Sequence, residues 1–293
     1  MSSVFTPADT TRFLLIGGCG RSGTTFIQER LGACNEISGI LDFESKLFAE
    51  PASIPDLFDF YVYSYTQSRF DWMANIFVSS VERNFALLPE SNEVAPITKD
   101  SAVAAAREFV GHLYRVRTGS LNLADAFRRY ATPFLYGVLQ PEPARWVLEK
   151  TPHNALQFGR VLNVYPKSRL IHVVRDPRRI AESLARQDWF TGSFEDAVIW
   201  VRLYYEQYWR LRSSSGGKND RELTIRLEDC VNSPRVISQR IGEFLDIEDT
   251  QIRFDGDIVL PNQGFRNLSD DQLQFANSQL FPTIEAFGYN LEL

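Results

Sequence analysis

Short apolar runs followed by helical patterns recur along the chain. The run "RFLLIGG" (12–18) ends in glycines and precedes a helical pattern, which is typical of a buried parallel strand that enters a βα unit. Similar runs are "RWVLEK" (145–150), "RLIHVV" (169–174) and "ELTIRL" (222–227). Strands that alternate with helices predict an α/β fold with a mostly parallel sheet flanked by helices.

Capping residues mark helices in the second half of the chain. Residues 193–214 form a long helical pattern that Ser193 can cap and that Gly216 and Gly217 can end. After the last apolar run, Ser233 is a candidate N-cap and Pro234 suits the first helical position. These signals support the alternation of strands and helices.

The segment 48–136 has a different character. It contains successive aromatic-rich amphipathic patterns, densest in "DLFDFYVYSY" and "FDWMANIFVSSVERNFALL", and predicts an inserted group of helices. Two interpretations of its aromatic residues stay open. They form a helical layer packed on the sheet, or some of them line a pocket.

Composition narrows the class of protein. The 293 residues are 44% hydrophobic and 23% charged, which is typical of a globular chain, here expected to be one domain over 1–293. The net charge of −6 argues against a nucleic-acid partner, so any anion site must be a local group of cations. The three cysteines have unrelated spacings, which predicts neither disulfides nor a metal site. We see no signal peptide or membrane segment and expect a cytoplasmic protein.

The loop after the first apolar run has the spacing of a phosphate-binding loop. Gly18 and Gly23 stand five apart and two threonines follow, which gives G-x-x-x-x-G-T-T where a nucleotide triphosphatase has G-x-x-x-x-G-K-[ST]. Free backbone N–H groups and the helix dipole favour an anion here. Thr24 replaces the lysine and Arg21 brings a cation into the loop, which suits a phosphate or sulfate without a metal-bound triphosphate. The alternative is a tight turn that binds nothing.

A second candidate anion site follows the third apolar run. Arg175 comes at the tip of a predicted strand, Asp176 can cap the next helix, Pro177 can start it, and Ser183 lies two turns along it. An arginine and a hydroxyl in this arrangement can bind a phosphate. Because ligands collect at the carboxyl ends of parallel strands, this site and the first loop are expected to face one ligand. A surface arginine and a structural serine are the alternative.

Together these motifs resemble the sulfotransferases that use 3′-phosphoadenylyl sulfate (PAPS). "GRSGTT" (20–25) is similar to their loop for the 5′-phosphosulfate, and "VVRDPRRIAESL" to their 3′-phosphate strand and helix, with Arg175 and Ser183 eight apart. "LEKTPHN" is similar to the family's E-K-T-P strand end, "IRLEDCVNSPRVISQRIGEFLDI" to its Y-E-D-L segment, and "FRNLSDDQLQFANSQLFPTIEAFGYN" to its C-terminal tail. The resemblance spans most of 12–290 and leaves 48–136 unmatched.

The resemblance implies PAPS as donor, adenosine 3′,5′-bisphosphate (PAP) as product and no metal. It assigns the 5′-phosphosulfate to the first loop and the 3′-phosphate to the second motif. A basic residue in a C-terminal loop is expected to contact the 3′-phosphate as well, just before a helix that Ser269 and Gln272 can cap. The implied donor-binding residues are Arg21, Ser22, Gly23, Thr24, Thr25, Arg175, Ser183 and Arg266. Leu227 departs from the pattern, because the family has an aromatic residue before the Glu-Asp pair, which puts adenine recognition in doubt.

The same resemblance supplies catalytic candidates. Lys150, at the end of a strand, is expected to donate to the sulfate or the bridging oxygen. Glu44, 23 positions after Arg21, is the first candidate base by similarity to the branch that acts on sugar or tyrosyl hydroxyls. His153 is the second, by similarity to enzymes of small phenols and alcohols, and Asp42 is a weaker version of Glu44. A surface glutamate, a helix-capping histidine and a solvated lysine are the structural alternatives.

The expected function is transfer of a sulfuryl group to a hydroxyl or phenol of a small-molecule, carbohydrate, lipid or carrier-bound acceptor. Segment 48–136 is the expected acceptor-binding part. The alternatives are a P-loop kinase or NTPase, which would need the missing lysine, and a non-catalytic nucleotide-binding protein that retained the fold. Neither the acceptor nor the oligomeric state can be read from the sequence.

Overall fold

The computed structural model describes residues 12–64, 66–88, 97–117, 122–140, 142–214, 220–254, 265 and 268–291. Across these ranges the strands form one five-stranded parallel sheet in the order β2-β3-β1-β4-β5. The strands are β1 Phe13–Gly18, β2 Ile37–Ser38, β3 Trp146–Lys150, β4 Arg169–Val174 and β5 Glu222–Arg226. The predicted α/β fold is confirmed. The sequence pattern did not indicate β2, because two residues are too short to show a period.

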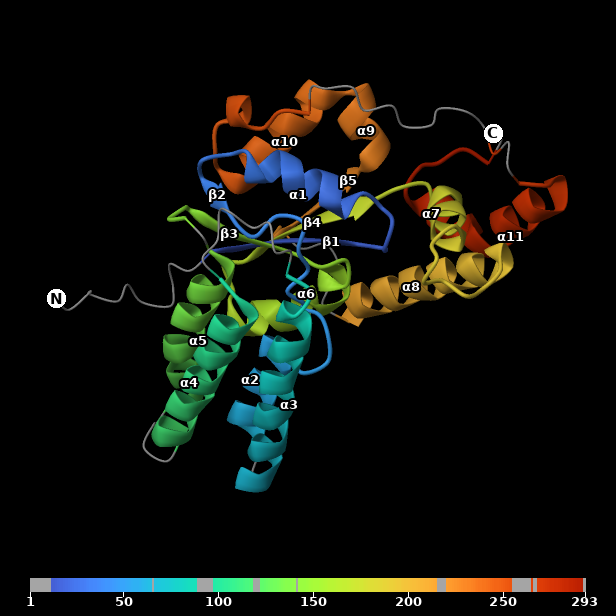
Figure 1. Ribbon diagram of the computed structural model, residues 1–293. Coiled ribbons are helices and arrows are strands. Elements are labelled where there is room, and N and C mark those ends of the chain that lie inside the picture. Colours follow the sequence, from blue (N-terminus) through green and yellow to red (C-terminus); the bar gives the residue numbers. More distant parts are fainter. Residues whose placement is uncertain are drawn as a thin grey trace.

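Both faces of the sheet are apolar. Along β1, Phe13 and Leu15 enter one buried cluster while Leu14 and Ile16 enter the other, as the two-residue period of a strand requires. Helices cover each face, which makes a layered α/β domain (Figure 1). On one side lie α1 Thr24–Gly32, α9 Leu227–Asn232 and α10 Pro234–Leu245, with the short 3-10 helix η2 Asp249–Gln251 after them. On the other lie α6 Asn154–Val164, α7 Pro177–Ala185, α8 Phe194–Ser214 and α11 Asp270–Ala286.

The aromatic-rich segment forms helices that extend away from the sheet as a lobe (Figure 1). Its helices are α2 Ile54–Tyr63, α3 Gln67–Phe85, α4 Lys99–Arg117 and α5 Leu123–Leu139. They pack mainly on one another, and they reach the rest of the domain through α2 on α6 and α5 on β3. Most contacts of these helices are therefore within the lobe, and α5 is the helix that packs against the sheet.

The aromatic rings of the lobe explain why it holds together. Phe109 stacks on Phe134 with ring centres 5.2 Å apart, and Phe77 meets both rings edge-on. Buried rings in this part of the chain are Phe48, Phe58, Tyr61, Phe70, Phe77, Phe85, Phe109, Phe127 and Phe134. These rings belong to the core and not to a pocket surface. Trp72, Tyr63 and Tyr114 are exposed instead, with 56%, 67% and 37% of their surface accessible.

Charged side chains tie the lobe to α6. The Arg160 guanidinium on α6 donates to Asp56 Oδ1 at 2.8 Å and to Asp59 Oδ2 at 2.7 Å, both on α2. Arg128 on α5 donates to the backbone oxygen of Val164 at 2.7 Å, where α6 ends. The lobe is thereby oriented with respect to the helix that follows β3.

The predicted helix starts are found with one difference. Ser193 caps α8, since its Oγ accepts from the Asp196 N–H at 3.1 Å, and the glycines at 216–217 lie outside the described residues. Asp176 caps α7 through the Arg178 N–H at 3.0 Å. The Ser269–Gln272 capping box starts α11. Ser233 precedes α10, but its hydroxyl makes no capping hydrogen bond and Pro234 alone begins the helix.

Within the described ranges, no helix has both the length and the apolar character needed to cross a membrane.

Candidate active site

The turn between β1 and α1 is built for close approach of a ligand to the backbone. Arg21 and Gly23 both have left-handed φ angles, of 72° and 98°. A Cβ at Gly18 would lie 2.3 Å from the Val173 oxygen, so only glycine fits there. Gly23 is the N-cap of α1 and provides no side-chain cap, so the first N–H groups of the helix remain available to an anion.

Ser22 is the clearest polar group without a partner in this loop. Its side chain is fully buried, and Oγ has no hydrogen-bond partner among the residues that the structure describes. A buried hydroxyl without a partner is costly, and an anion in the loop would supply the missing acceptor. Of the two threonines that follow, Thr24 is buried and Thr25 is exposed.

The two sequence motifs meet at one edge of the sheet. β4 lies directly beside β1, with Gly18 paired to Val173. Arg175 Nη1 donates to the backbone oxygen of Arg21 at 3.3 Å, and Arg21 Nε donates to Ser183 Oγ at 3.2 Å. Three side chains predicted to bind the donor therefore lie side by side, although the motifs are far apart in sequence.

The charge balance at this edge favours an anion. Burial lowers the pKa of the Arg175 guanidinium, the neighbouring Arg179 and Arg21 lower it further, and the Glu228 carboxylate opposes them. A guanidinium whose charge is disfavoured by burial and by two like charges gains from a bound phosphate. The edge is thus a local cationic site in an acidic chain.

Lys150 and Glu44 form an ion pair on the other side of β1. Lys150 ends β3, where it pairs with Ile16 of β1, and its side chain is only 4% exposed. Its Nζ donates to Glu44 Oε1 at 2.9 Å, and the Glu44 side chain is 37% exposed. The candidate base and the candidate cation therefore lie in contact beside the loop. Asp42, the weaker candidate, is exposed and has a left-handed φ of 52°.

A buried carboxylate that the sequence did not single out organises this region. Glu149 is 2% exposed, and Oε1 accepts from Ser45 Oγ at 2.8 Å and from Thr151 Oγ1 at 2.7 Å. Its Oε2 accepts from Asn154 Nδ2 at 2.7 Å. Burial raises the pKa of Glu149, and these hydrogen bonds oppose that shift. The network joins the neighbours of Glu44 to the end of β3 and the start of α6.

His153 lies on the turn that follows β3. Pro152 accepts from the Gly18 N–H at 2.8 Å, which pins this turn to the phosphate-binding loop. His153 Nδ1 lies 3.4 Å from Glu50 Oε1, and this contact lowers the pKa of Glu50 despite partial burial. The residue occupies the N-cap position of α6 but makes no capping hydrogen bond. It is therefore not a helix-capping histidine.

Two further residues singled out in the sequence are Leu227 and Arg266. Leu227 is buried, and a Cβ built on Gly23 would lie 2.7 Å from its Cδ1, so this side chain packs against the loop glycine. Arg266 lies outside the described residues.

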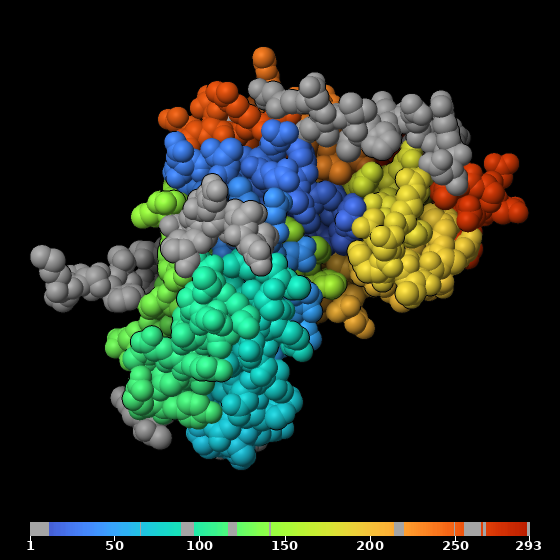
Figure 2. All heavy atoms as spheres, in the orientation of Figure 1, coloured from blue at the N-terminus to red at the C-terminus, as the bar shows by residue number. Residues whose placement is uncertain are grey.

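The two predicted motifs also meet at the surface of the molecule. In the space-filling view, the blue atoms of the β1–α1 unit and the yellow atoms of α7 and α8 reach the same face, with the lobe of α2 to α5 extending below (Figure 2).

A family model described as "Sulfotransferase family" matches residues 14–251 of the sequence. The chain belongs to the sulfotransferase family. Among curated proteins no match was found.

Solved sulfotransferase structures share the fold. The sulfotransferase STF9 from Mycobacterium avium matches with a TM-score of 0.51 and 16% identity over 97% of this chain and 78% of its own. The sulfotransferase domain of the Synechococcus PCC 7002 olefin synthase matches with a TM-score of 0.51 and 18% identity over 96% of both chains. Family and fold support sulfuryl transfer in general.

Proposed function

We propose that this sulfotransferase transfers the sulfuryl group of PAPS to a hydroxyl or phenol, releasing PAP. The observation that supports the donor best is the contact chain Arg175–Arg21–Ser183, which joins the two motifs predicted to bind separate phosphates. A triphosphate site would need one phosphate cradle with a lysine, whereas this chain has two predicted phosphate-binding motifs and has Thr24 in the lysine position. Residues 1–293 are proposed to act as one such domain.

The residues of the loop fit a phosphosulfate. Backbone N–H groups at the start of α1, the Arg21 guanidinium and the buried Ser22 hydroxyl would hold the 5′ side. Arg175 and Ser183 would hold the 3′-phosphate, with Arg266 as a further predicted contact. PAPS, when bound, supplies the sulfuryl group and a stable bisphosphate as the leaving group.

Glu44 and Lys150 are proposed to carry the chemistry. Glu44 would take the proton from the acceptor oxygen as that oxygen attacks the sulfur. Lys150 would donate to the oxygen that bridges sulfur and phosphorus, where negative charge develops as the bond between the sulfur and this oxygen breaks. Their 2.9 Å contact holds both groups in place before the ligands bind.

His153 remains the second candidate base. Its contact with Glu50 orients the ring. The acceptor is proposed to be a small molecule, a carbohydrate, a lipid or a carrier-bound intermediate that enters beside the lobe of α2 to α5 in segment 48–136. We propose a cytoplasmic location.

Calorimetric binding of PAP, 5′-AMP and Mg-ATP to the wild type, Arg175→Ala and Arg240→Ala tests the donor. Arg240 is an exposed arginine on α10 and gives the same change in charge away from the site. We expect PAP to bind most tightly, Arg175→Ala to lose most of the preference for PAP over 5′-AMP, and Arg240→Ala to keep it. Tighter binding of Mg-ATP would favour the kinase alternative. Binding of PAP without turnover of labelled PAPS on any acceptor would favour the non-catalytic one.

A further inference from the structure

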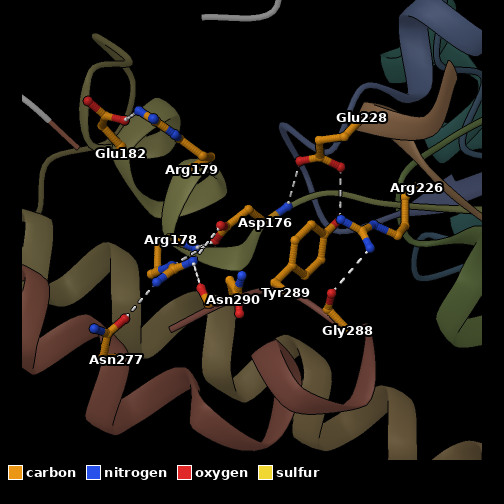
Figure 3. Close-up of polar contacts among 10 residues, drawn as sticks. All are labelled: Asp176, Arg178, Arg179, Glu182, Arg226, Glu228, Asn277, Gly288, Tyr289 and Asn290. Carbon is orange, nitrogen blue, oxygen red and sulfur yellow. Dashed lines mark hydrogen bonds and ion pairs between the residues drawn. The ribbon is translucent and has the colours of Figure 1, made fainter. Parts of the chain in front are cut away.

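The backbone that presents Arg175 is held by residues from the other end of the chain (Figure 3). Glu228 Oε1 accepts from the backbone N–H of Asp176 at 3.0 Å, and Glu228 Oε2 accepts from the Tyr289 hydroxyl at 2.9 Å. One carboxylate thus joins the residue directly after Arg175 to the segment that follows α11. Burial and the Glu228 charge both raise the pKa of Tyr289, so the phenol stays protonated and donates.

Arg178 makes a second connection from the same turn to the same segment. Its side chain is fully buried and donates to both Asp176 carboxylate oxygens, at 3.0 and 2.7 Å. It also donates to Asn277 Oδ1 at 2.9 Å and to the backbone oxygen of Asn290 at 2.6 Å. The first turn of α7 is therefore fixed to α11 and to the residues after it.

The Tyr289 ring is itself held in place. The Arg226 guanidinium stacks 4.2 Å from the ring centre, and Arg226 Nη1 donates to the backbone oxygen of Gly288 at 3.2 Å. Arg226 ends β5, the strand beside β4. Figure 3 shows the contacts of Glu228 with Asp176 and Tyr289, and the contact of Arg226 with the neighbouring Gly288.

Stability alone is a weak reason for so many buried and half-buried polar groups. Buried charged pairs are commonly no more stabilising than apolar side chains of similar size, because removing charges from water is expensive. Buried polar contacts do fix geometry, and here they converge on the residue next to Arg175. A small displacement of this backbone would move the Arg175 guanidinium away from Arg21 and Ser183.

We propose that Glu228 and Tyr289 are positioning residues for the 3′-phosphate, with Tyr289 acting through Glu228 on the Asp176 N–H. The inference rests on the proposed function, since it concerns the phosphate that distinguishes PAP from 5′-AMP. The C-terminal segment 288–290 is thereby part of the donor site without touching the donor.

Tyr289→Phe tests this with the loss of a single oxygen atom. Tyr208→Phe is the matched control, because Tyr208 also donates to a buried glutamate, Glu222 Oε1 at 2.7 Å, at the opposite end of β5. We expect Tyr289→Phe to weaken PAP binding about tenfold, as the loss of a hydrogen bond to a charged group allows, and to leave 5′-AMP binding unchanged. Tyr208→Phe should keep the wild-type ratio of the two affinities, and thermal unfolding compares the stability of the two variants.

The outcomes separate the inference from the function. If wild type binds PAP no better than 5′-AMP, the proposed donor is wrong and the inference falls with it. If wild type prefers PAP and Tyr289→Phe keeps the full preference, the inference is overturned while the proposed donor stands. The same holds if Tyr289→Phe and Tyr208→Phe lose the preference for PAP equally. If Tyr289→Phe does not fold, Arg226→Lys removes the stacking partner of the ring and should reduce the PAP preference in the same direction.

Discussion

Glu44 and Lys150 have to be considered together, because each supplies the charge that the other needs. An ammonium that is 4% exposed loses most of its hydration, and the carboxylate at 2.9 Å compensates for that loss. Removing Glu44 entirely would leave a buried unpaired cation, so an alanine variant would confuse catalysis with stability. The isosteric amide is the informative change.

We expect Glu44→Gln to lower kcat about 10²- to 10⁴-fold while PAP binding is retained. The amide oxygen still accepts from Lys150 Nζ, so the lysine stays in place and only the proton acceptor is lost. Steady-state kinetics with labelled PAPS and calorimetry with PAP measure the two effects. His153→Asn and Glu50→Gln form the comparison. A large loss of kcat in both of these, with Glu44→Gln active, would assign the base to the His153–Glu50 pair.

Glu149 shows which site residues escape prediction from sequence. Strand β3 has three apolar residues followed by Glu149 and Lys150. This order gives no sign that the glutamate is buried beneath the site while the lysine reaches toward Glu44. Its partner Ser45 is 104 positions away and becomes a neighbour only when the chain has folded. The same holds for Glu228 and Tyr289, which are 61 positions apart.

At the scale of the elements, the β1–α1 turn requires glycine at position 23 for two reasons, its backbone conformation and the lack of space for a side chain. Gly23 has a φ of 98°, and the space where a Cβ would stand is taken by the Leu227 side chain at the start of α9. Leu227, which departs from the aromatic residue of the family pattern, thus has a structural role of its own against the loop.

We expect Gly23→Ala to destabilise the protein by about 1–2 kcal/mol through the left-handed φ, with an added cost from the Leu227 contact. The double variant Gly23→Ala/Leu227→Ala should relieve the clash between the new Cβ and the leucine but not the backbone strain. We therefore expect the double variant to bind PAP more weakly than Leu227→Ala alone. Urea unfolding and calorimetry measure these differences. Wild-type affinity in Gly23→Ala would show that the loop backbone does not need this conformation to bind the donor.

Strand β4 carries a buried histidine with a predictable effect on stability. Burial, with a smaller contribution from Arg212, lowers the pKa of His172 to about 3, although Glu222 Oε1 lies 3.7 Å from Nδ1. Between about pH 6.5 and 3 the unfolded chain binds a proton at this residue and the folded one does not. Stability is therefore lost as the pH falls, by about 1.4 kcal/mol per pH unit from His172.

His172→Phe should remove this contribution, since the phenyl ring can pack against Tyr208, whose ring centre is 4.3 Å from that of His172. Urea unfolding at pH 7 and pH 5 should show a smaller drop in the variant than in wild type, by about 2 kcal/mol. Equal drops in the two proteins would mean that the imidazole is not held neutral in the folded state.

The sequence predicts the fold class of the sheet but not all of its strands or the packing of the helices around it. β1, β3, β4 and β5 have apolar runs long enough to recognise, whereas β2 has two residues and is defined only by its pairing with Trp146 and Val147. The meeting of Arg21, Arg175 and Ser183 did follow from sequence reasoning, because parallel strands bring their carboxyl ends to one edge. The packing of the lobe did not, since amphipathic helices do not reveal which apolar faces they meet.

At the scale of the whole molecule, the local charge at the proposed donor site is opposite in sign to the net charge of the protein. The net charge of −6 repels an anionic nucleotide at long range, while Arg21, Arg175 and Arg179 attract it at short range. Added salt screens both effects, with a Debye length of about 10 Å at 0.1 M. The sign of the salt dependence therefore shows which effect governs binding.

We expect PAP affinity to fall as the salt concentration rises, because contacts of the phosphates with the cationic edge dominate over the diffuse repulsion. Calorimetry at low and high potassium chloride measures the slope, with Arg240→Ala as a control for a distant charge. Arg175→Ala should bind more weakly and show a shallower slope, since one short-range attraction is gone. A wild-type affinity that rises with salt would mean that the net charge governs, and that the arginines at the ends of β1 and β4 do not hold the bisphosphate.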